Sequence, residues 1–144
     1  MKVADLLAGK GSTVKTIEPT ASIRTLAQKL KSESIGAMVV SADQLRIVGI
    51  ISERDVVRGY ADYGPAVDNL TVADLMTRGV ITCKPEDKIS EVSRVMTNRR
   101  IRHLPVKNGD RLVGLVSIGD VLKHRIDEIQ LEANVLRDYA IAHR

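Results

Sequence analysis

Apolar and polar positions along this chain follow one pattern that occurs twice. Residues 23–30 have apolar side chains at helical spacing, and residues 89–96 repeat that spacing, which predicts two amphipathic helices. Each helix follows a short segment that ends at Pro19 or Pro85. Each helix also precedes two runs of strand-forming residues, which are 36–40, 47–51, 103–106 and 112–116. A further helix is expected after the second run, so each copy should fold in the order strand, helix, strand, strand, helix.

Turn and capping residues mark the ends of these elements. Ser22 or Thr20, and Asp87, are the predicted helix N-caps. The Asn-Gly pair at 108–109 predicts a hairpin turn. Residues 60–69 include a Gly-Pro pair and are the predicted linker between the copies. The second apolar run of each copy is almost wholly apolar, which predicts strands that are buried on both faces.

The end of the chain has no counterpart in either copy. Residues 127–142 have one apolar face, which predicts an added helix. The residues of that face are Ile129, Ala133, Leu136 and Ala140. The face either binds a second copy or a partner protein, or packs on its own domain. We therefore divide the chain into a first repeat (1–66), a second repeat (67–126) and a C-terminal helical tail (127–144).

Longer stretches of sequence are also duplicated. Residues 48–57 return as 113–122, and residues 3–7 return as 72–76. Repeats of this kind usually pack against each other, because one unit cannot bury its apolar face alone. Small ligands often bind in the clefts between such units. The boundary between the two copies is therefore the expected location of a site.

Both copies contain the motif Gly-apolar-apolar-Ser-x-x-Asp where a strand ends and a helix begins. Its polar members are Ser52 and Asp55 in the first copy, and Ser117 and Asp120 in the second. A serine at a helix start leaves backbone N–H groups that bind anions, and an aspartate one turn later suits the hydroxyls of a ribose. Phosphate and ribose together indicate a nucleotide. The alternative is that the serines are N-caps and the aspartates are first-turn acids facing the helix dipole; the return of both residues in the second copy favours a function.

With these motifs, the chain resembles a tandem pair of CBS domains over about residues 3–125. It is most similar to small stand-alone two-repeat proteins with a C-terminal helical tail. The resemblance implies an α+β fold in which two β-α-β-β-α repeats pack with pseudo-twofold symmetry and leave two clefts. It also implies homodimers, and adenine nucleotides as ligands: AMP, ATP or a nicotinamide dinucleotide, NAD(H).

The family pattern implies which residues contact the ligand. The serines and aspartates of the motif would take the ribose and nearby phosphate oxygens, and the starts of the strands would frame or cover the base. The apolar residues before the motif serines would add cover. The full predicted set is Thr16, Ile17, Ile35, Gly36, Ala37, Ile50, Ser52, Arg54, Asp55, Thr82, Ile101, Arg102, His103, Leu115, Ser117, Gly119 and Asp120.

The two copies differ at positions that matter for charge. Arg102 and His103 stand where the first copy has Gly36 and Ala37. A guanidinium offers a planar fork to phosphate, and His103 adds charge if a phosphate raises its pKa. The cleft with Asp120 is therefore expected to bind phosphate better, and the small pair leaves room for a flat base.

The two copies also differ in charge at the start of the helix that follows the motif serine. Arg54 stands opposite Gly119 and could supply charge to the other cleft. The alternatives are that Arg102 only extends the charged surface begun by Arg99 and Arg100, and that His103 is structural.

Composition narrows the function classes. The chain of 144 residues is 44% hydrophobic but has no Trp, no Phe and three Tyr, so the core should be aliphatic. Scarce aromatic residues argue against single-stranded nucleic-acid binding, which uses aromatic stacking; only the net charge of +4 supports a nucleic-acid partner. The single cysteine, Cys83, excludes an intrachain disulfide. With no signal peptide or membrane span expected, the predicted location is the cytoplasm.

No pattern indicates catalysis, a metal or a catalytic cofactor. Cys83 and the histidines lack ligand spacing. The segment Gly9–Ser12 fails the phosphate-loop pattern at Ala4 and Gly11, although Lys10 could lie over a cleft. We therefore expect a non-enzymatic regulatory module that binds an adenine nucleotide and acts through a homodimer or a downstream protein that the sequence does not identify. The alternative is a structural interaction scaffold with weakly occupied clefts.

Overall fold

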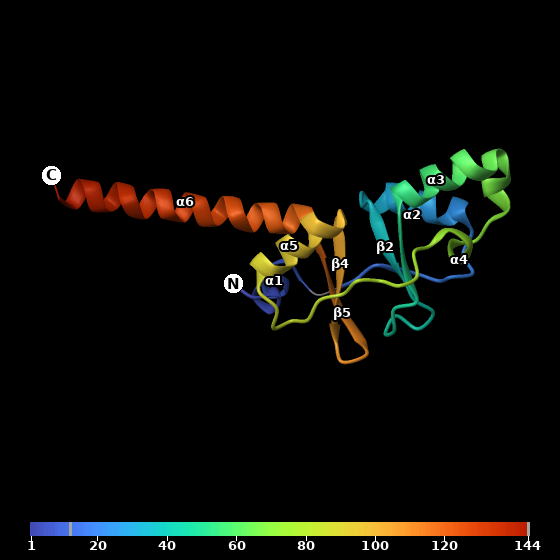
Figure 1. Ribbon diagram of the computed structural model, residues 1–144, viewed down its shortest axis with the longest axis horizontal. Helices are drawn as coiled ribbons and strands as arrows, with labels where there is room; N and C mark the ends of the chain where they lie inside the picture. Colours follow the sequence, from blue (N-terminus) through green and yellow to red (C-terminus); the bar gives the residue numbers. More distant parts are fainter. Residues whose placement is uncertain (12, 144) are drawn as a thin grey trace.

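The first half of the chain forms a three-stranded sheet with helices packed on it (Figure 1). The structure is a computed structural model that describes residues 1–11 and 13–143; Ser12, part of the Gly9–Ser12 segment considered above, and Arg144 lie outside the described residues. The elements are β1 (Thr16–Ile17), α2 (Ile23–Glu33), β2 (Ala37–Val40), β3 (Gly49–Ser52) and α3 (Glu53–Tyr63). In the sheet, β2 lies between β1, to which it is parallel, and β3, to which it is antiparallel.

The second half repeats this arrangement. Its elements are α5 (Ile89–Arg99), β4 (His103–Asn108), β5 (Arg111–Ser117) and α6 (Ile118–Ala142). Strands β4 and β5 form an antiparallel hairpin, and Cys83 makes a parallel bridge to Val106 at the place that β1 takes in the first half. The predicted α+β fold with two strand-helix-strand-strand-helix repeats and a C-terminal helix is therefore confirmed.

A short helix completes the core of the opposite repeat in each case. Helix α1 (Val3–Lys10) packs into the core of the second repeat, whereas α4 (Val72–Leu75) packs into the core of the first. The backbone N–H of Val3 donates to Asp87 O, and the equivalent N–H of Val72 donates to Ala21 O, both at 2.8 Å. A 3-10 helix, η1 (Gly64–Asn69), connects α3 to α4. The duplicated helices at 3–7 and 72–76 therefore bind the two halves together.

Two glycines allow this close packing. A β-carbon placed on Gly49 would lie 2.7 Å from Met76 Sδ and 2.8 Å from the carbonyl oxygen of Thr77. A β-carbon on Gly114 would lie 2.7 Å from both terminal carbons of Leu7. The glycine of the duplicated motif is therefore required where a strand passes the helix that completes its repeat.

Several predicted boundaries were wrong. Asp87 does not cap α5: Lys88 is the N-cap, and the Asp87 carboxylate instead accepts the backbone N–H of Lys84 at 2.8 Å. Ser22 is the N-cap of α2, as predicted. The predicted linker begins too early, because α3 continues through Tyr63 and ends only at the Gly-Pro pair, where Gly64 has a φ of 59° and Pro65 has no backbone N–H to continue the helix.

Burial of the strands also differs from the prediction. Every residue of β2 is buried because β2 is the central strand of its sheet. The strands predicted to be buried on both faces, β3 and β5, instead alternate between buried and half-buried positions. An edge strand covered on one face shows that alternation. The hairpin prediction was correct: Gly109 has a φ of 64° between β4 and β5.

The tail is not a separate helix. Helix α6 runs without a break from Ile118 to Ala142, so the last helix of the second repeat and the predicted added helix are one element (Figure 1). Residues 1–11 and 13–143 include no helix with the length and apolar composition needed to cross a membrane.

Candidate functional site

A cleft of about 350 Å³ lies between the two repeats. We call it the inter-repeat cleft. It is lined by Lys10, Gly11, Thr13, Val14, Lys15, Ser34, Ile35, Gly36, Ala37, His103, Leu115 and Ser117. Small-molecule sites typically measure roughly 300–1,000 Å³. A cleft of this size between two related units can hold a small ligand.

Ser117 and Asp120 form a closed pair at the start of α6. The Asp120 Oδ2 atom accepts the backbone N–H of Ser117 at 2.8 Å and its hydroxyl at 2.9 Å. In return, Ser117 Oγ accepts the backbone N–H of Asp120 at 3.2 Å. The pair is therefore a capping box, in which the serine is the N-cap and the aspartate satisfies the N–H before the helix.

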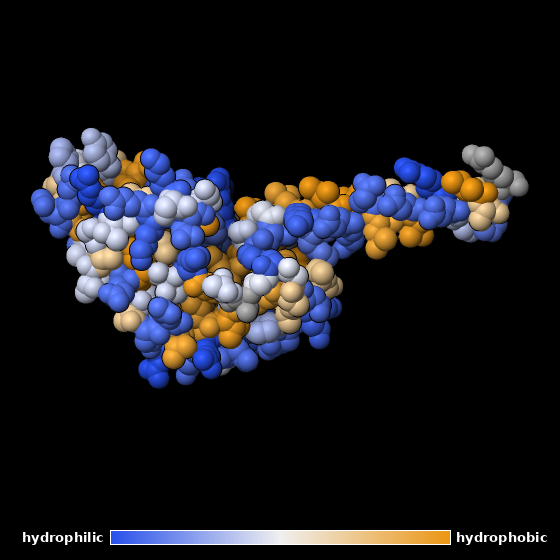
Figure 2. All heavy atoms as spheres, turned by 180° about the vertical axis from the view of Figure 1, so that it is seen from behind, coloured by the Kyte–Doolittle hydropathy of each residue, from blue (hydrophilic) through white to orange (hydrophobic). Residues whose placement is uncertain are grey.

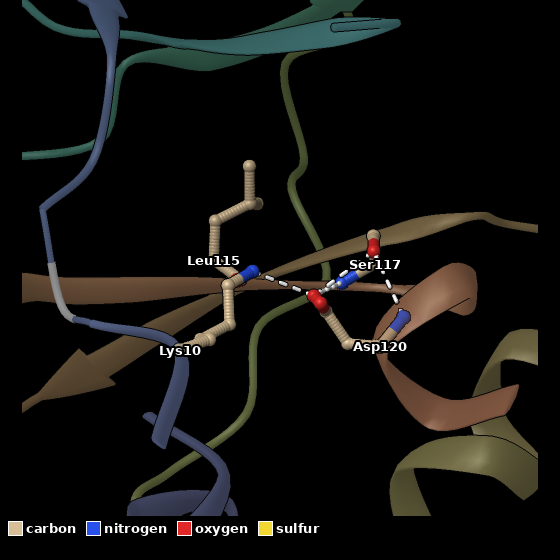
Figure 3. A network of polar contacts seen from close by, with 4 residues as sticks. All are labelled: Lys10, Leu115, Ser117 and Asp120. Atoms are coloured by element: carbon tan, nitrogen blue, oxygen red, sulfur yellow. Dashed lines mark hydrogen bonds and ion pairs between the residues drawn. The ribbon is translucent and has the colours of Figure 1, made fainter. Parts of the chain in front are cut away.

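Lys10 joins this pair from the end of α1 (Figure 3). Its Nζ atom donates to Asp120 Oδ2 at 2.6 Å and to the carbonyl oxygen of Leu115 at 2.9 Å. The ion pair is partly exposed, with 37% of the Lys10 side chain and 23% of the Asp120 side chain accessible to solvent. The lysine thus places a positive charge at the inter-repeat cleft. This charge balances the carboxylate of Asp120, the aspartate of the motif in the second repeat.

The contacts of Asp120 keep it ionised. Burial alone would raise the pKa of this carboxyl, but hydrogen bonds from Lys10 and Ser117 outweigh burial, and the pKa lies below its usual value. In the part of the chain that the structure describes, every hydrogen bond that the Asp120 carboxylate accepts is made to Oδ2. The other oxygen, Oδ1, accepts no hydrogen bond from the described residues.

His103 lies on the wall of the cleft where the repeats meet. A β-carbon placed on Gly36 would be 3.1 Å from Glu53 Oε1 and 4.0 Å from His103 Cε1, so Gly36 brings the first repeat close to the imidazole. Burial lowers the pKa of His103 below 6.5; the Asp120 carboxylate opposes this effect, and the Lys10 ammonium adds to it. The imidazole is therefore neutral near pH 7 and becomes charged more readily beside an anion.

The first repeat has a similar capping box without the lysine. Asp55 Oδ2 accepts the backbone N–H of Ser52 at 2.8 Å and its hydroxyl at 3.1 Å. The carbonyl oxygen of Ile50, equivalent to that of Leu115, accepts the backbone N–H of Thr77 at 2.9 Å instead of an ammonium. The two repeats thus differ in charge at equivalent positions, and the positive charge is on the side of Asp120.

The structure brings together only part of the predicted ligand set. Six of the predicted residues line the inter-repeat cleft, namely Ile35, Gly36, Ala37, His103, Leu115 and Ser117, and Asp120 joins them through its bonds to Ser117 and Lys10. The side chains of Arg54 and Arg102 are exposed and do not line this cleft. The remaining predicted residues also lie outside the lining and are Thr16, Ile17, Ile50, Ser52, Asp55, Thr82, Ile101 and Gly119.

Backbone pairing explains several of these positions. The Ile17 side chain is in the core of the first repeat, and its carbonyl oxygen accepts the N–H of Ser41. Ile101 packs against the core of the second repeat. The carbonyl oxygen of Arg102 accepts the N–H of Ile118 at 2.9 Å, and that of Gly36 accepts the N–H of Glu53 at the same distance. These contacts hold the strand starts in equivalent places in both repeats.

Sequence reasoning did not find the segment before β1. Thr13, Val14 and Lys15 line the cleft, and Lys15 also pairs with Glu33 at 3.5 Å. The family motif that guided the prediction begins at the strand itself. The stretch from Lys10 to Lys15 could have indicated these residues. It is polar and basic, and it connects a helix to a strand, so it was bound to run over the surface, where binding residues often lie.

A second hollow, of about 390 Å³, lies between α2 and α3. Its lining is mainly apolar and consists of Ala27, Leu30, Lys31, Ile35, Glu53, Val56 and Val57. Among residues 1–11 and 13–143, no group of three or more histidine, cysteine or acidic side chains is placed to hold a metal ion. Burial raises the pKa of the Cys83 thiol to about 12, with a smaller effect from Asp87, so this thiol is un-ionised at neutral pH.

Both repeats match known proteins. The family model described as the CBS domain matches residues 10–62 and again residues 72–127. The crystal structure of the CBS-domain containing protein ATU1752 from Agrobacterium tumefaciens superposes with a TM-score of 0.83 at 40% identity, over 87% of this chain and 99% of that chain. The CBS domain pair of protein MJ0100, crystallised in complex with 5′-methylthioadenosine and S-adenosyl-L-methionine, superposes with a TM-score of 0.74 at 26% identity, over 85% of this chain and 98% of that chain.

A curated enzyme also contains a similar region. The arabinose 5-phosphate isomerase KdsD of Yersinia pestis is 32% identical over 123 residues, which are 85% of this chain. The chain spans only 37% of the length of that isomerase. The similarity therefore concerns one part of the enzyme.

Proposed function

Because this chain belongs to the family of CBS-domain proteins, we propose that it is a non-enzymatic regulatory module that binds an adenine nucleotide between its two CBS domains. The ligand would be AMP, ATP or NAD(H). The duplicated units would be residues 1–66 and 67–126, followed by the tail from 127. The inter-repeat cleft, with Asp120 at its edge, would be the principal site.

The observation that supports this proposal most strongly is the arrangement around Asp120. Ser117 and Lys10 hold one carboxylate oxygen, and the pKa of the group is lowered, so the carboxylate is ionised and fixed in orientation. A fixed carboxylate with one available oxygen suits a ribose, whose hydroxyls donate hydrogen bonds. In the first repeat, Asp55 accepts the equivalent bonds from Ser52, without a lysine beside it.

The charge beside this carboxylate favours a phosphorylated ligand. Lys10 and Lys15 line the cleft, and His103 lies on its wall. A phosphate near His103 would raise the pKa of the imidazole and so strengthen its own binding. Arg102 would turn its exposed guanidinium towards a phosphate at the mouth of the cleft, and Arg54 would serve the first repeat in the same way.

The base would lie against small and apolar residues. Gly36 and Ala37 leave space at the start of β2, and Leu115 and Ile35 add apolar surface. The backbones near Thr16, Ile17 and Thr82 and the side chains of Ile50 and Ile101 would frame the base, with Gly119 at the start of α6. The MJ0100 pair supports an adenosine-containing ligand, because both molecules in its complex contain adenosine.

Regulation would proceed through pairing of two modules. Exposed apolar residues on α3 and at the start of α6 would form the contact with a second copy, and they are Val57, Tyr60, Tyr63, Ile118 and Leu122. A ligand changes such a pair only if it binds two arrangements with different affinity. The protein that responds would be a downstream partner in the cytoplasm.

Thermal unfolding in the presence of AMP, ATP and NADH tests the proposal. A ligand at a hundred times its dissociation constant stabilises the folded chain by about 2.7 kcal/mol. Asp120→Ala should lose most of that stabilisation, and Asp55→Ala reports on the first repeat in the same way. If none of the three nucleotides stabilises the wild-type chain, the nucleotide-sensor proposal is wrong and the interaction scaffold becomes the better account.

A further inference from the structure

Helix α6 continues well beyond the module to which it belongs. Val121 is buried and His124 and Glu128 are half-buried, whereas every described residue from 129 to 143 is exposed. Figure 1 shows this part of the helix extending away from all other elements. Most helical stability in proteins comes from tertiary packing of an amphipathic face, and this part of α6 has no such packing within the described chain. The CBS family model ends at 127, so the extension is outside the conserved module.

Helix α6 carries a regular apolar row that starts on the module and continues along the extension. We call it the heptad row; it consists of Leu122, Ile126, Ile129, Ala133, Leu136 and Ala140, at alternating steps of four and three residues. Steps of this kind place side chains along one line of a helix that packs against another helix as a coiled coil. The large members of the row are all exposed in the single chain, by 49–69%. Figure 2 shows apolar side chains along the projecting helix.

The heptad row faces away from the module. The face that packs on the module contains Val121, His124 and Glu128. At about 100° per residue, the heptad row is centred roughly 130° around the helix from that face, so its side chains do not pack on the module. Two copies can therefore bring their rows together around a twofold axis without displacing α6 from its own module.

Charges beside the row are complementary in a parallel pair. In that arrangement Glu132 of one copy lies opposite Arg137 of the other, and the contact occurs twice by symmetry. Arg125 then lies opposite the neutral Gln130. An antiparallel pair that uses the whole row would instead place Glu132 opposite Glu132, and Lys123 opposite Arg137, so that like charges repel.

From these observations we infer that α6 binds α6 of a second copy of this chain as a parallel two-stranded coiled coil along the heptad row. This contact extends the module pairing proposed above and does not depend on any nucleotide. Ala133 and Ala140 allow the two helices to approach closely at the distal end. The coiled coil would fix how the two modules are oriented, and so which surfaces they show to other proteins.

Sedimentation equilibrium of the full chain tests the contact. Ile129→Asp and Leu136→Asp should each raise the dimer dissociation constant at least about a hundredfold, because each dimer would bury two unpaired carboxylates. Leu131→Asp is the matched control, since Leu131 is 65% exposed on the opposite side of the same helix, and it should leave the constant unchanged. The inference would be overturned by any of three results. The wild-type chain could stay monomeric, the substitutions at 129 and 131 could have equal effects, or Ile129→Asp could leave the dimer unaffected. In the last case, pairing through the modules alone would remain.

Charge exchange tests the orientation of the helices. Glu132→Arg or Arg137→Glu alone should weaken the dimer, because each places like charges opposite each other. The double variant should restore the wild-type dissociation constant. Failure of the double variant to recover the loss would rule out the parallel arrangement. Circular dichroism of each variant shows whether the modules remain folded, and nucleotide titration of the same samples separates this contact from ligand binding.

Discussion

Lys10 and Asp120 are far apart in sequence but meet at 2.6 Å beside the cleft between the repeats. The lysine is available there because its helix, α1, belongs to the core of the second repeat. Partly exposed ion pairs contribute only about 0–1 kcal/mol to stability. The main consequence of this pair is therefore the charge of the cleft, where a carboxylate alone would repel phosphate.

Replacing the lysine should separate phosphate recognition from ribose recognition. Lys10→Met leaves the Asp120 carboxylate without its counterion, so affinity for AMP should fall about tenfold or more while affinity for adenosine changes much less. Isothermal titration calorimetry with the two ligands measures the ratio. Lys29→Met, on an exposed helix face away from the cleft, is the control. Equal losses for AMP and adenosine would contradict the assigned role of the charge.

The two capping boxes should stabilise the fold by similar amounts. Ser117→Ala removes the hydroxyl that accepts the Asp120 N–H, and Ser52→Ala removes the equivalent contact to Asp55. Each change should lower the free energy of unfolding by about 1 kcal/mol, as for other lost N-caps. Urea denaturation measures this loss, with the exposed Ser90→Ala as the reference. A loss no larger than that of the reference would show that the caps are not energetically important.

The motif glycines should tolerate a methyl group to different degrees. Gly49→Ala forces its β-carbon against the Thr77 carbonyl, which is backbone and cannot swing away, and should cost about 1–3 kcal/mol. Gly114→Ala meets only the flexible end of Leu7 and should cost less. Gly9→Ala meets nothing within 4 Å and, being helical, should stabilise the chain by roughly 0.5–1 kcal/mol. The reverse order in thermal unfolding would contradict the packing described for these strands.

Stability should depend on pH through His103. Burial lowers the pKa of this imidazole in the folded chain, so the unfolded chain takes up the proton first as the pH falls. The free energy of unfolding should therefore be independent of the protonation of His103 above about pH 6.5 and should decrease as the pH falls below that value. His103→Asn should flatten this decrease. An identical pH profile for His103→Asn and the wild-type chain would be inconsistent with a buried, neutral imidazole.

The repeated pattern was sufficient to predict most of the fold. Apolar spacing identified α2 and α5, and residues such as Leu26 and Val92 are buried as that spacing requires. The duplicated Ser and Asp were correctly placed at helix starts. Local patterns could not show that α1 completes the second repeat, because that contact joins Val3 to Asp87 across most of the chain.

The composition of the cleft was harder to predict for the same reason. Ser117 and His103 were identified from a motif within one repeat, and Lys10 was named as a residue that could lie over a cleft. Thr13 was missed, because it reaches the cleft only after the repeats have packed. The motif also could not show that the serine hydroxyl is already engaged by its own aspartate. A sequence motif identifies the residues but does not show which of their atoms remain available.

Amide chemical-shift mapping during titration with AMP tests the central proposal most directly. If the nucleotide binds between the repeats, the largest shifts should be at Gly36, His103, Leu115, Ser117 and Asp120, and should saturate together. Shifts confined to the hollow between α2 and α3, or no shifts at saturating AMP, would contradict nucleotide binding in the inter-repeat cleft.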